Sequence, residues 1–475
     1  MKFSAHFKLG KEQAELDFVD IDPSRDLELY LDPYAMEIRD DEWSAECGDY
    51  IRSFFQAILD ALRKDDNRRA RDLILRLSEP NETCLGVSRG KPQGRGVGAF
   101  QGDLILQALR NSVAFKTGLL SDLAEAELFI EGVGRDKISD LTTNVIRGPL
   151  LQYTKAQCDL HGVPTSRVAT APSWQPQSSR WESTYAPLPV IGHKPILLVP
   201  KFSVRQRLSL ESQEFYNHYM IEFLQSEYEH GSSGLVQVLK SGRRRVYKKD
   251  VKARHPFVKD DLAKFVTEHP EVLEAYKKLK GAQGALGSED LEEGFDERAL
   301  ASVLKARLAE IPPGGDAAHT YHSLMTGILT FVFYPELIFP IKERELHEGR
   351  KRVDILFTNA ARDGFFFRMQ VAAQTRSSHI FVECKNYSYD VGNPELDQLS
   401  GRFGHQRGFL GLLVCRQDDR RDLTRARCRD TAQDSRGYII VLSDDDIGTV
   451  LDFIAGGQRD RISHFMQLRY NELVL

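Results

Sequence analysis

The last third of the chain alternates short apolar runs with helical patterns, and this alternation limits its fold more than any other feature. Runs of strand length occupy residues 337–346, 352–358, 379–386, 409–415 and 438–442. Helical patterns at residues 321–334 and 418–434, and a further helix capped by Asn393, lie among them. The first two runs are joined by a short turn and pair naturally as a hairpin. We therefore predict a mixed β-sheet flanked by helices for residues 296–475.

Two stretches of loop-like composition divide the rest of the chain. Residues 166–189 are rich in proline and serine, and residues 281–295 carry glycines and acids, so we interpret both as linkers. The boundaries predict an N-terminal recognition or regulatory α+β domain at 1–165 and a middle α+β domain at 190–280. In the first of these, residues 50–63 have the spacing of an amphipathic helix, and Ser139 or Asp140 is expected to cap another. The fold class is mixed α/β with several domains.

Composition excludes several classes of protein. With 41% hydrophobic and 28% charged residues the chain resembles a soluble globular protein, and no apolar run is long enough to span a bilayer. The N-terminus lacks the apolar core of a secretory signal, so we expect a cytoplasmic protein without membrane contacts. Six scattered cysteines form no CxxC pair, which argues against a disulfide framework or a structural zinc site. We expect them to be reduced and packed in cores.

Two acids in apolar strands indicate a metal site. Asp354 lies in VDILF and Glu383 in IFVECKNY, where an ionised carboxylate is costly unless a positive group is bound. Carboxylate oxygens with a backbone carbonyl suit magnesium or manganese better than zinc. We therefore predict that Asp354, Glu383 and the carbonyl of Cys384 bind Mg²⁺ or Mn²⁺. Lys385 shares a strand face with Glu383 and is expected to orient water beside a phosphate. The alternative is a core acid paired with a lysine.

Asp354 and the sequence Glu383-Cys384-Lys385 resemble the motif of the PD-(D/E)xK, or restriction-endonuclease-like, superfamily. The resemblance extends over roughly residues 316–445. It implies a restriction-endonuclease-like sheet and magnesium-dependent cleavage of phosphodiester bonds. It also implies that Gln398, in the helix after the ExK strand, acts in catalysis by holding substrate or water. Arg402 lies one turn further on the same helix face and is expected to contact nucleic acid.

The sequence departs from the superfamily pattern in two ways. No proline precedes Asp354, and the first helix lacks the glutamate that is frequent there. Glu343 or Glu345, on the adjoining strand, is expected to substitute as a metal ligand. Whether one or two metal ions bind therefore stays open.

The densest basic segment of the chain lies at residues 240–254, which hold eight basic residues and one acid, Asp250. Clustered Lys and Arg with an interleaved Tyr247 match what the phosphate backbone of nucleic acid attracts. A solvated turn and strand is the alternative interpretation. The residues that we expect to contact the backbone are Arg243, Arg244, Arg245, Lys248, Lys249 and Lys252.

Together these features predict a metal-dependent endonuclease that acts on nucleic acid, with DNA favoured over RNA. A nuclease joined to recognition domains is typical of bacterial restriction and anti-phage (antiviral) defence, which is an analogy and not a chemical argument. Two alternatives stay open: a nucleic-acid-binding protein on a catalytically degenerate nuclease fold, and a toxic nuclease effector restrained by a partner. A second copy of the chain or a regulatory protein is the further partner that we expect.

Overall fold

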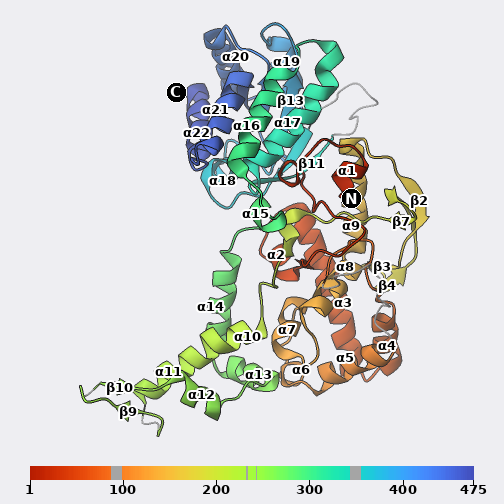
Figure 1. Ribbon diagram of the computed structural model, residues 1–475, viewed down its shortest axis with the longest axis vertical. Coiled ribbons are helices and arrows are strands. Elements are labelled where there is room, and N and C mark those ends of the chain that lie inside the picture. Colours follow the sequence, from red (N-terminus) through yellow and green to blue (C-terminus); the bar gives the residue numbers. More distant parts are fainter. Residues whose placement is uncertain (87–98, 232–233, 242, 343–354, 475) are drawn as a thin grey trace.

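Two hydrophobic cores organise the chain. The structure is a computed structural model that describes residues 1–86, 99–231, 234–241, 243–342 and 355–474. Residues between Phe3 and Tyr276 form one core, and residues between Leu300 and Leu473 form the other. Ile338 and Phe339 belong to the first core, while Ala14 belongs to the second, so the two parts interlock. Figure 1 shows the C-terminal part, in blue and cyan, above the N-terminal part.

The part around the first core is mainly helical. Its longest helix, α3, begins after Asp41, whose carboxylate accepts a hydrogen bond from the backbone N–H of Ser44 at 2.9 Å. One face of α3 is buried, as the apolar spacing of residues 50–63 predicts. The α-helices of this part are α1 (Phe3–His6), α2 (Pro33–Glu37), α3 (Glu42–Arg63), α4 (Asn67–Leu75), α5 (Ala99–Asn111), α6 (Val113–Thr117), α7 (Ala126–Phe129), α8 (Arg135–Val145), α9 (Arg147–His161), α10 (Ser212–Phe215), α11 (Ile221–His230), α12 (Lys248–Arg254), α13 (Lys259–Glu268) and α14 (Pro270–Gly281).

Short antiparallel strand pairs complete this part. The pairs are β1 (Tyr30–Leu31) with β8 (Val204–Arg205), β2 (Ser166–Ala169) with β5 (Tyr185–Leu188), β3 (Ser173–Gln175) with β4 (Arg180–Glu182), β6 (Val190–Ile191) with β7 (Lys194–Pro195), and β9 (Gln237–Val238) with β10 (Arg244–Arg245). Residues 1–165 and 190–280 thus contribute to the same core.

The segment that composition indicates as a linker, residues 166–189, is folded. Trp174 on β3 is fully buried, and its ring centroid lies 5.2 Å from that of Phe54 on α3 and 5.6 Å from that of Trp181. The indole N–H of Trp174 donates to Ser53 Oγ at 3.3 Å. Proline disfavours the interior of a helix but permits short strand pairs. The rings of Trp174 and Trp181 pack against Phe54 and so hold these strands on α3.

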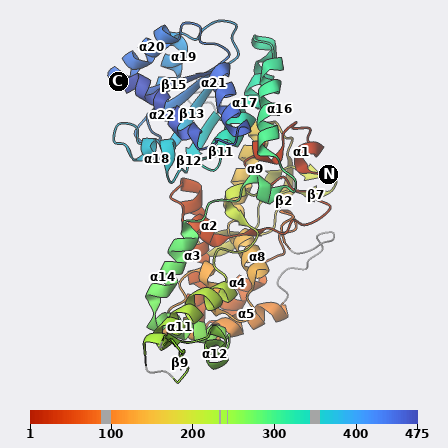
Figure 2. The same cartoon turned by 60° about the vertical axis from the view of Figure 1, so that its left-hand side comes forward.

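The C-terminal part is a five-stranded sheet covered by helices, which confirms the mixed α/β class. Its strand order is β11-β12-β13-β14-β15. Strand β13 pairs antiparallel with β12 and parallel with β14. The strands are β11 (Leu337–Ile341), β12 (Ile355–Asn359), β13 (His379–Lys385), β14 (Leu410–Cys415) and β15 (Tyr438–Ser443). The helices are α15 (Ser288–Leu291), α16 (Glu297–Glu310), α17 (Ala318–Phe333), α18 (Gly364–Val371), α19 (Asn393–Ser400), α20 (Arg421–Gln433), α21 (Asp444–Ala455) and α22 (Arg461–Val474). Figure 2 shows the sheet between these helices.

Two further observations concern the apolar character of the helices and the state of the cysteines. Within the described residues, none of the helices combines the length and the apolar character needed to cross a membrane. All six cysteines are buried as free thiols, as expected from their scatter along the sequence.

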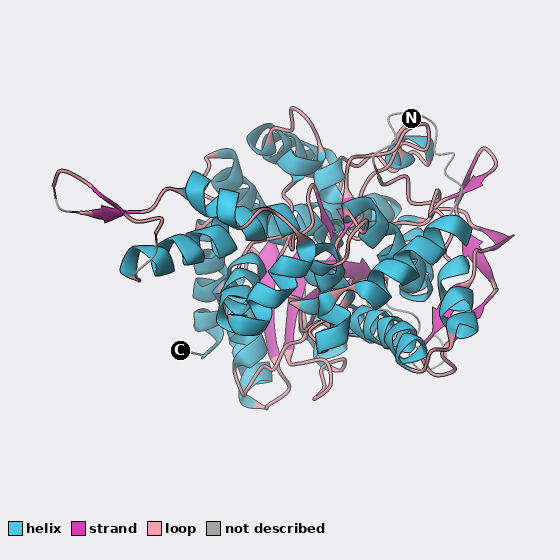
Figure 3. Cartoon of the chain, turned by 90° about the horizontal axis from the view of Figure 1, so that it is seen from below, coloured by secondary structure: helices cyan, strands magenta, loops and turns pink. Residues whose placement is uncertain are grey.

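The described residues of the basic segment at 240–254 belong to a projecting hairpin, the basic hairpin, and to the helix α12 that follows it. Strands β9 and β10 make a small hairpin, and α12 follows it directly. In Figures 1 and 3 the hairpin extends away from the body of the molecule. All eight basic side chains of the segment are exposed: Lys240, Arg243, Arg244, Arg245, Lys248, Lys249, Lys252 and Arg254.

Candidate active site

Glu383 and Lys385 meet at the carboxyl end of β13. Successive side chains of a strand alternate between its faces, so residues two apart lie together. The Lys385 ammonium donates to Glu383 Oε1 at 2.7 Å, and the Gln398 amide of α19 donates to the same oxygen at 2.8 Å. Glu383 is 1% exposed, so its carboxylate depends on these partners for the solvation that water supplies elsewhere.

Arg402 adds a second buried positive charge to this cluster. Its side chain is 2% exposed, its Nη2 lies 4.0 Å from Glu383 Oε2, and its Nε donates to the carbonyl of Gln398 at 3.3 Å. The sequence predicts that Arg402 contacts nucleic acid, and in the structure its side chain is buried beside Glu383 and Gln398. The turn after α19 folds back onto the sheet and carries Arg402 inward. The cluster of Glu383, Lys385, Gln398 and Arg402 therefore combines one carboxylate with two cations.

His322 is a residue of this region that the sequence interpretation misses. It lies on α17, and its Nε2 is 2.9 Å from the carbonyl oxygen of Cys384. A carbonyl only accepts, so Nε2 carries the proton of this hydrogen bond. The Asn386 amide donates to the carbonyls of Pro312 and Gly314, which fixes the loop before α17 to the end of β13. His322 is one of several polar residues in α17, so the sequence does not single it out.

Two tyrosines follow directly after β13. The rings of Tyr387 and Tyr389 are stacked, with centroids 4.8 Å apart and an interplanar angle of 19°. The Lys385 ammonium lies 5.9 Å from the centroid of the Tyr387 ring. Tyr389 is 61% exposed, so the outer face of this stack is open to a planar group such as a nucleobase.

The remaining predicted metal ligands, Asp354, Glu343 and Glu345, lie outside the described residues. Asp354 is bonded to Ile355, and the Cα partner of Ile355 across β12 and β13 is Val382, which precedes Glu383. In the part of the chain that the structure describes, no three His, Cys, Asp or Glu residues form a group suited to a metal ion. The metal-ligand roles of Asp354, Glu343 and Glu345 therefore stay predictions.

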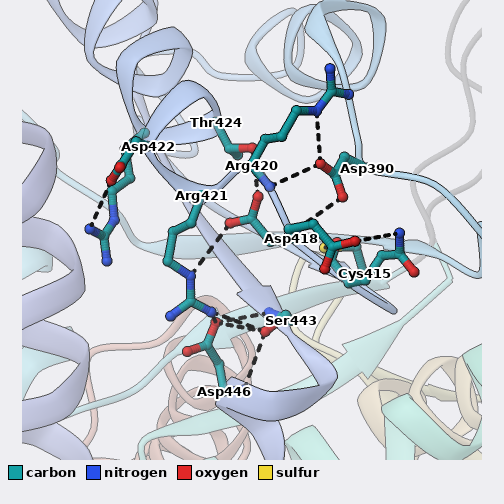
Figure 4. A network of polar contacts seen from close by, with 12 residues as sticks. Asp390, Cys415, Asp418, Arg420, Arg421, Asp422, Thr424, Ser443 and Asp446 are labelled. Atoms are coloured by element: carbon teal, nitrogen blue, oxygen red, sulfur yellow. Dashed lines mark hydrogen bonds and ion pairs between the residues drawn. The ribbon is translucent and has the colours of Figure 1, made fainter.

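The arginines of α20 and the turn before it are held by acids of the same domain. Arg421 donates to Asp446 at 2.8 Å, and Arg420 donates to Asp390 at 3.1 Å (Figure 4). Arg425 lies 2.9 Å from Glu472 of α22. Hydrogen bonds from two backbone N–H groups and Arg420 hold the pKa of Asp390 below its usual value, against the effect of burial. These contacts join α20 to neighbouring elements, although the side chain of Arg420 is 65% exposed.

The basic hairpin and the cluster around Glu383 are at opposite ends of the molecule. In Figures 1 and 2, β13 lies in the upper domain and the hairpin lies at the bottom. Within the basic segment, Lys248 pairs with Glu222 at 2.6 Å, and the Arg245 guanidinium lies 4.8 Å from the ring centroid of Tyr247. The structure thus brings together Glu383, Lys385, Gln398 and Arg402. The basic residues that we predict to contact the phosphate backbone of nucleic acid lie far from this cluster.

Comparison with known proteins gives one match. A family model described as a domain of unknown function (DUF8370) matches residues 8–211, which is less than half of the chain and excludes the C-terminal sheet. No curated protein and no solved structure matches the chain.

Proposed function

We propose that the chain is a divalent-metal-dependent nuclease that hydrolyses phosphodiester bonds of nucleic acid, with DNA as the favoured substrate and a restriction-endonuclease-like C-terminal domain. The observation that carries this proposal is the buried carboxylate of Glu383, whose Oε1 accepts from both Lys385 and Gln398. Strand β13 pairs antiparallel with β12 and parallel with β14, and α19 lies between β13 and β14 in the sequence. This order agrees with the mixed sheet that the superfamily resemblance implies.

The main rival is a structural ion pair on a degenerate nuclease fold. Lys385 and Gln398 both contact Glu383 Oε1, and Arg402 Nη2 lies 4.0 Å from Glu383 Oε2. The ammonium of Lys385 and the guanidinium of Arg402 therefore lie beside the same carboxylate, where they provide positive potential for a phosphate. This geometry favours the catalytic interpretation.

The donor atoms at β13 fit a hard divalent cation. Glu383 and the carbonyl of Cys384 would supply oxygen ligands, and a carbonyl oxygen has a second lone pair besides the one directed to His322. Asp354, which lies outside the described residues, is proposed as the further oxygen ligand. A bound Mg²⁺ or Mn²⁺ would polarise the phosphate and lower the pKa of water. Lys385 would orient that water and offset charge on the phosphate, while Gln398 holds the carboxylate of Glu383 in place. Arg402 supplies long-range attraction for the substrate.

Metal binding can be measured without cleavage. Replacing Glu383 with Gln is expected to weaken Mn²⁺ binding to the intact chain by at least about tenfold, because the charged oxygen ligand is removed. Isothermal titration calorimetry on the wild type and the variant measures this change. Glu310→Gln, which alters an exposed acid at the end of α16, is the matched control and should bind as the wild type does. Equal affinities for wild type and Glu383→Gln would exclude Glu383 as a ligand.

The basic hairpin is proposed to bind the phosphate backbone. Replacing Arg243, Arg244 and Arg245 together with Gln should weaken DNA binding and reduce the slope of log affinity against log salt by up to about 2.7, because each neutralised phosphate contributes about 0.9 to that slope. Fluorescence anisotropy with a labelled duplex at several salt concentrations measures the slope. A control triple variant of Arg63, Arg68 and Arg71, exposed on α3 and α4, should leave it unchanged. An unchanged slope in the hairpin variant would favour the alternative interpretation, in which the basic segment is a solvated turn and strand without a role in binding.

The separation of the hairpin from Glu383 constrains how a substrate binds. A duplex that touches both must run along the molecule, or the hairpin of one copy must serve the catalytic cluster of a second copy. Either arrangement agrees with a nuclease joined to a recognition part, as in restriction and anti-phage defence, which we infer by analogy alone.

A further inference from the structure

Two adjoining cavities lie between the N-terminal and C-terminal parts of the molecule. One has a volume of about 210 Å³ and is lined by the end of α2, by residues 282–285 and by the segments at 335–336 and 360–363. The other, of about 480 Å³, shares residues 38–39 and 360–362 with the first and extends toward α18. Ligand pockets typically have volumes of about 300–1,000 Å³, so the two cavities together have the size that a small organic ligand occupies.

Three arginines line the smaller cavity: Arg39, Arg205 and Arg362. Arg205 donates to the carbonyls of Phe202 and Val204, and Arg362 donates to those of Gly281 and Ile38. Backbone carbonyls satisfy N–H groups but carry no net charge. Across the described chain, neither Arg205 nor Arg362 has a carboxylate within the 4.0 Å of an ion pair.

The positive charge and the N–H groups of Arg39 are only partly matched by neighbouring groups. Its Nε donates to Asp41 at 3.0 Å, and its guanidinium lies 4.3 Å from the ring centroid of Phe202. Its Nη2 is buried and has no hydrogen-bond partner among the described residues, which leaves an N–H group unsatisfied. Burial lowers the pKa of Arg362, the nearby Arg39 and Arg205 lower it further, and Asp40 and Tyr34 act in the opposite direction. The three guanidinium groups thus repel one another in a partly desolvated wall.

Acids on the same wall restrict which anion fits. Glu336 and Asp363 also line the smaller cavity, and burial together with Asp363 raises the pKa of Glu336 to about 7. A ligand that is anionic along its whole length would be repelled by these groups. A ligand with phosphate at one end and hydroxyl or amino donors at the other satisfies both sets of side chains.

We infer that the two adjoining cavities together bind a nucleoside phosphate, with its phosphate groups on Arg39, Arg205 and Arg362 and its hydroxyl or amino groups toward Glu336 and Asp363. The walls come from the N-terminal part, from the segment after α14 and from the C-terminal part, so an occupant contacts all three. Ala360 directly follows β12, which pairs with β13. The nucleoside phosphate would therefore tie the recognition part to the sheet that carries Glu383.

Calorimetry tests this inference without nuclease activity. Each of the four ribonucleoside triphosphates is titrated into the intact chain in EDTA, beside inorganic tripolyphosphate and the free nucleosides. At least one triphosphate should bind, and more tightly than either tripolyphosphate or its own nucleoside. Arg362→Gln should weaken that binding by at least about tenfold, since it removes a charge-assisted hydrogen bond to phosphate, and Arg362→Lys should restore part of it.

Arg461→Gln is the matched control, because Arg461 is exposed on α22 and does not line the cavities. Its affinity should stay within twofold of the wild type, and unchanged melting temperatures without ligand should show that all variants are folded. No binding of any triphosphate at millimolar concentration would overturn the inference. So would equal binding by wild type and Arg362→Gln, or by a triphosphate and tripolyphosphate. Because no cleavage is measured, the result is independent of the proposed nuclease function.

Discussion

Replacing Glu383 with Gln or Lys385 with Ala is expected to lower the rate of magnesium-dependent DNA cleavage by at least about 100-fold. Glu383→Gln keeps the volume of the side chain but removes the charge that Lys385 and Gln398 surround. Lys385→Ala removes the ammonium group 2.7 Å from that carboxylate, and with it the group that offsets charge on the phosphate. The measurement is the initial rate of plasmid nicking at a fixed magnesium concentration.

Matched controls separate loss of chemistry from loss of structure. Glu310→Gln and Lys305→Ala change exposed residues of α16 in the same domain and should keep rates within about twofold of the wild type. Circular dichroism melting should show that both site variants remain folded. Full activity in Glu383→Gln and Lys385→Ala would mean that the cluster is a structural ion pair.

Trp174→Ala is expected to lower the free energy of unfolding by about 3–5 kcal/mol. The indole is fully buried, contacts the rings of Phe54 and Trp181, and donates a hydrogen bond to Ser53. Alanine would leave a cavity beside α3 that the surrounding helices fill only in part. Urea denaturation of wild type and variant, monitored by circular dichroism, measures the difference.

Tyr185→Ala provides the comparison within the same segment. Tyr185 on β5 is 64% exposed, so its replacement should change the free energy of unfolding by no more than about 0.5 kcal/mol. If Trp174→Ala were as mild as Tyr185→Ala, residues 166–189 would behave as the linker that their composition indicates.

The C-terminal sheet is predictable because its signals are local. Strands β14 and β15 are almost entirely apolar and β13 has an apolar centre, as buried strands of this length should. The pairing of Glu383 with Lys385 follows from the two-residue period of a strand. The superfamily resemblance implied that Gln398 holds substrate or water, but its hydrogen bond to Glu383 was not predicted.

The starts of two helices and one contact between distant residues were not predicted from the sequence. Ser139 and Asp140 have side chains suited to a helix cap, yet α8 begins at Arg135 and both residues lie within it, so that prediction was wrong. Gly392, and not Asn393, precedes α19, because Glu395 reaches back to its backbone N–H. The contact of His322 with Cys384 joins residues 62 positions apart and leaves no periodic signal.

Cleavage of supercoiled plasmid by the intact wild-type chain is the decisive test of a metal-dependent nuclease. We expect nicking that requires Mg²⁺ or Mn²⁺, that stops in EDTA, and that is abolished in Asp354→Ala under the same conditions. Nicking that continues in EDTA, or that Asp354→Ala retains in full, would contradict a metal-dependent site built on Asp354 and Glu383.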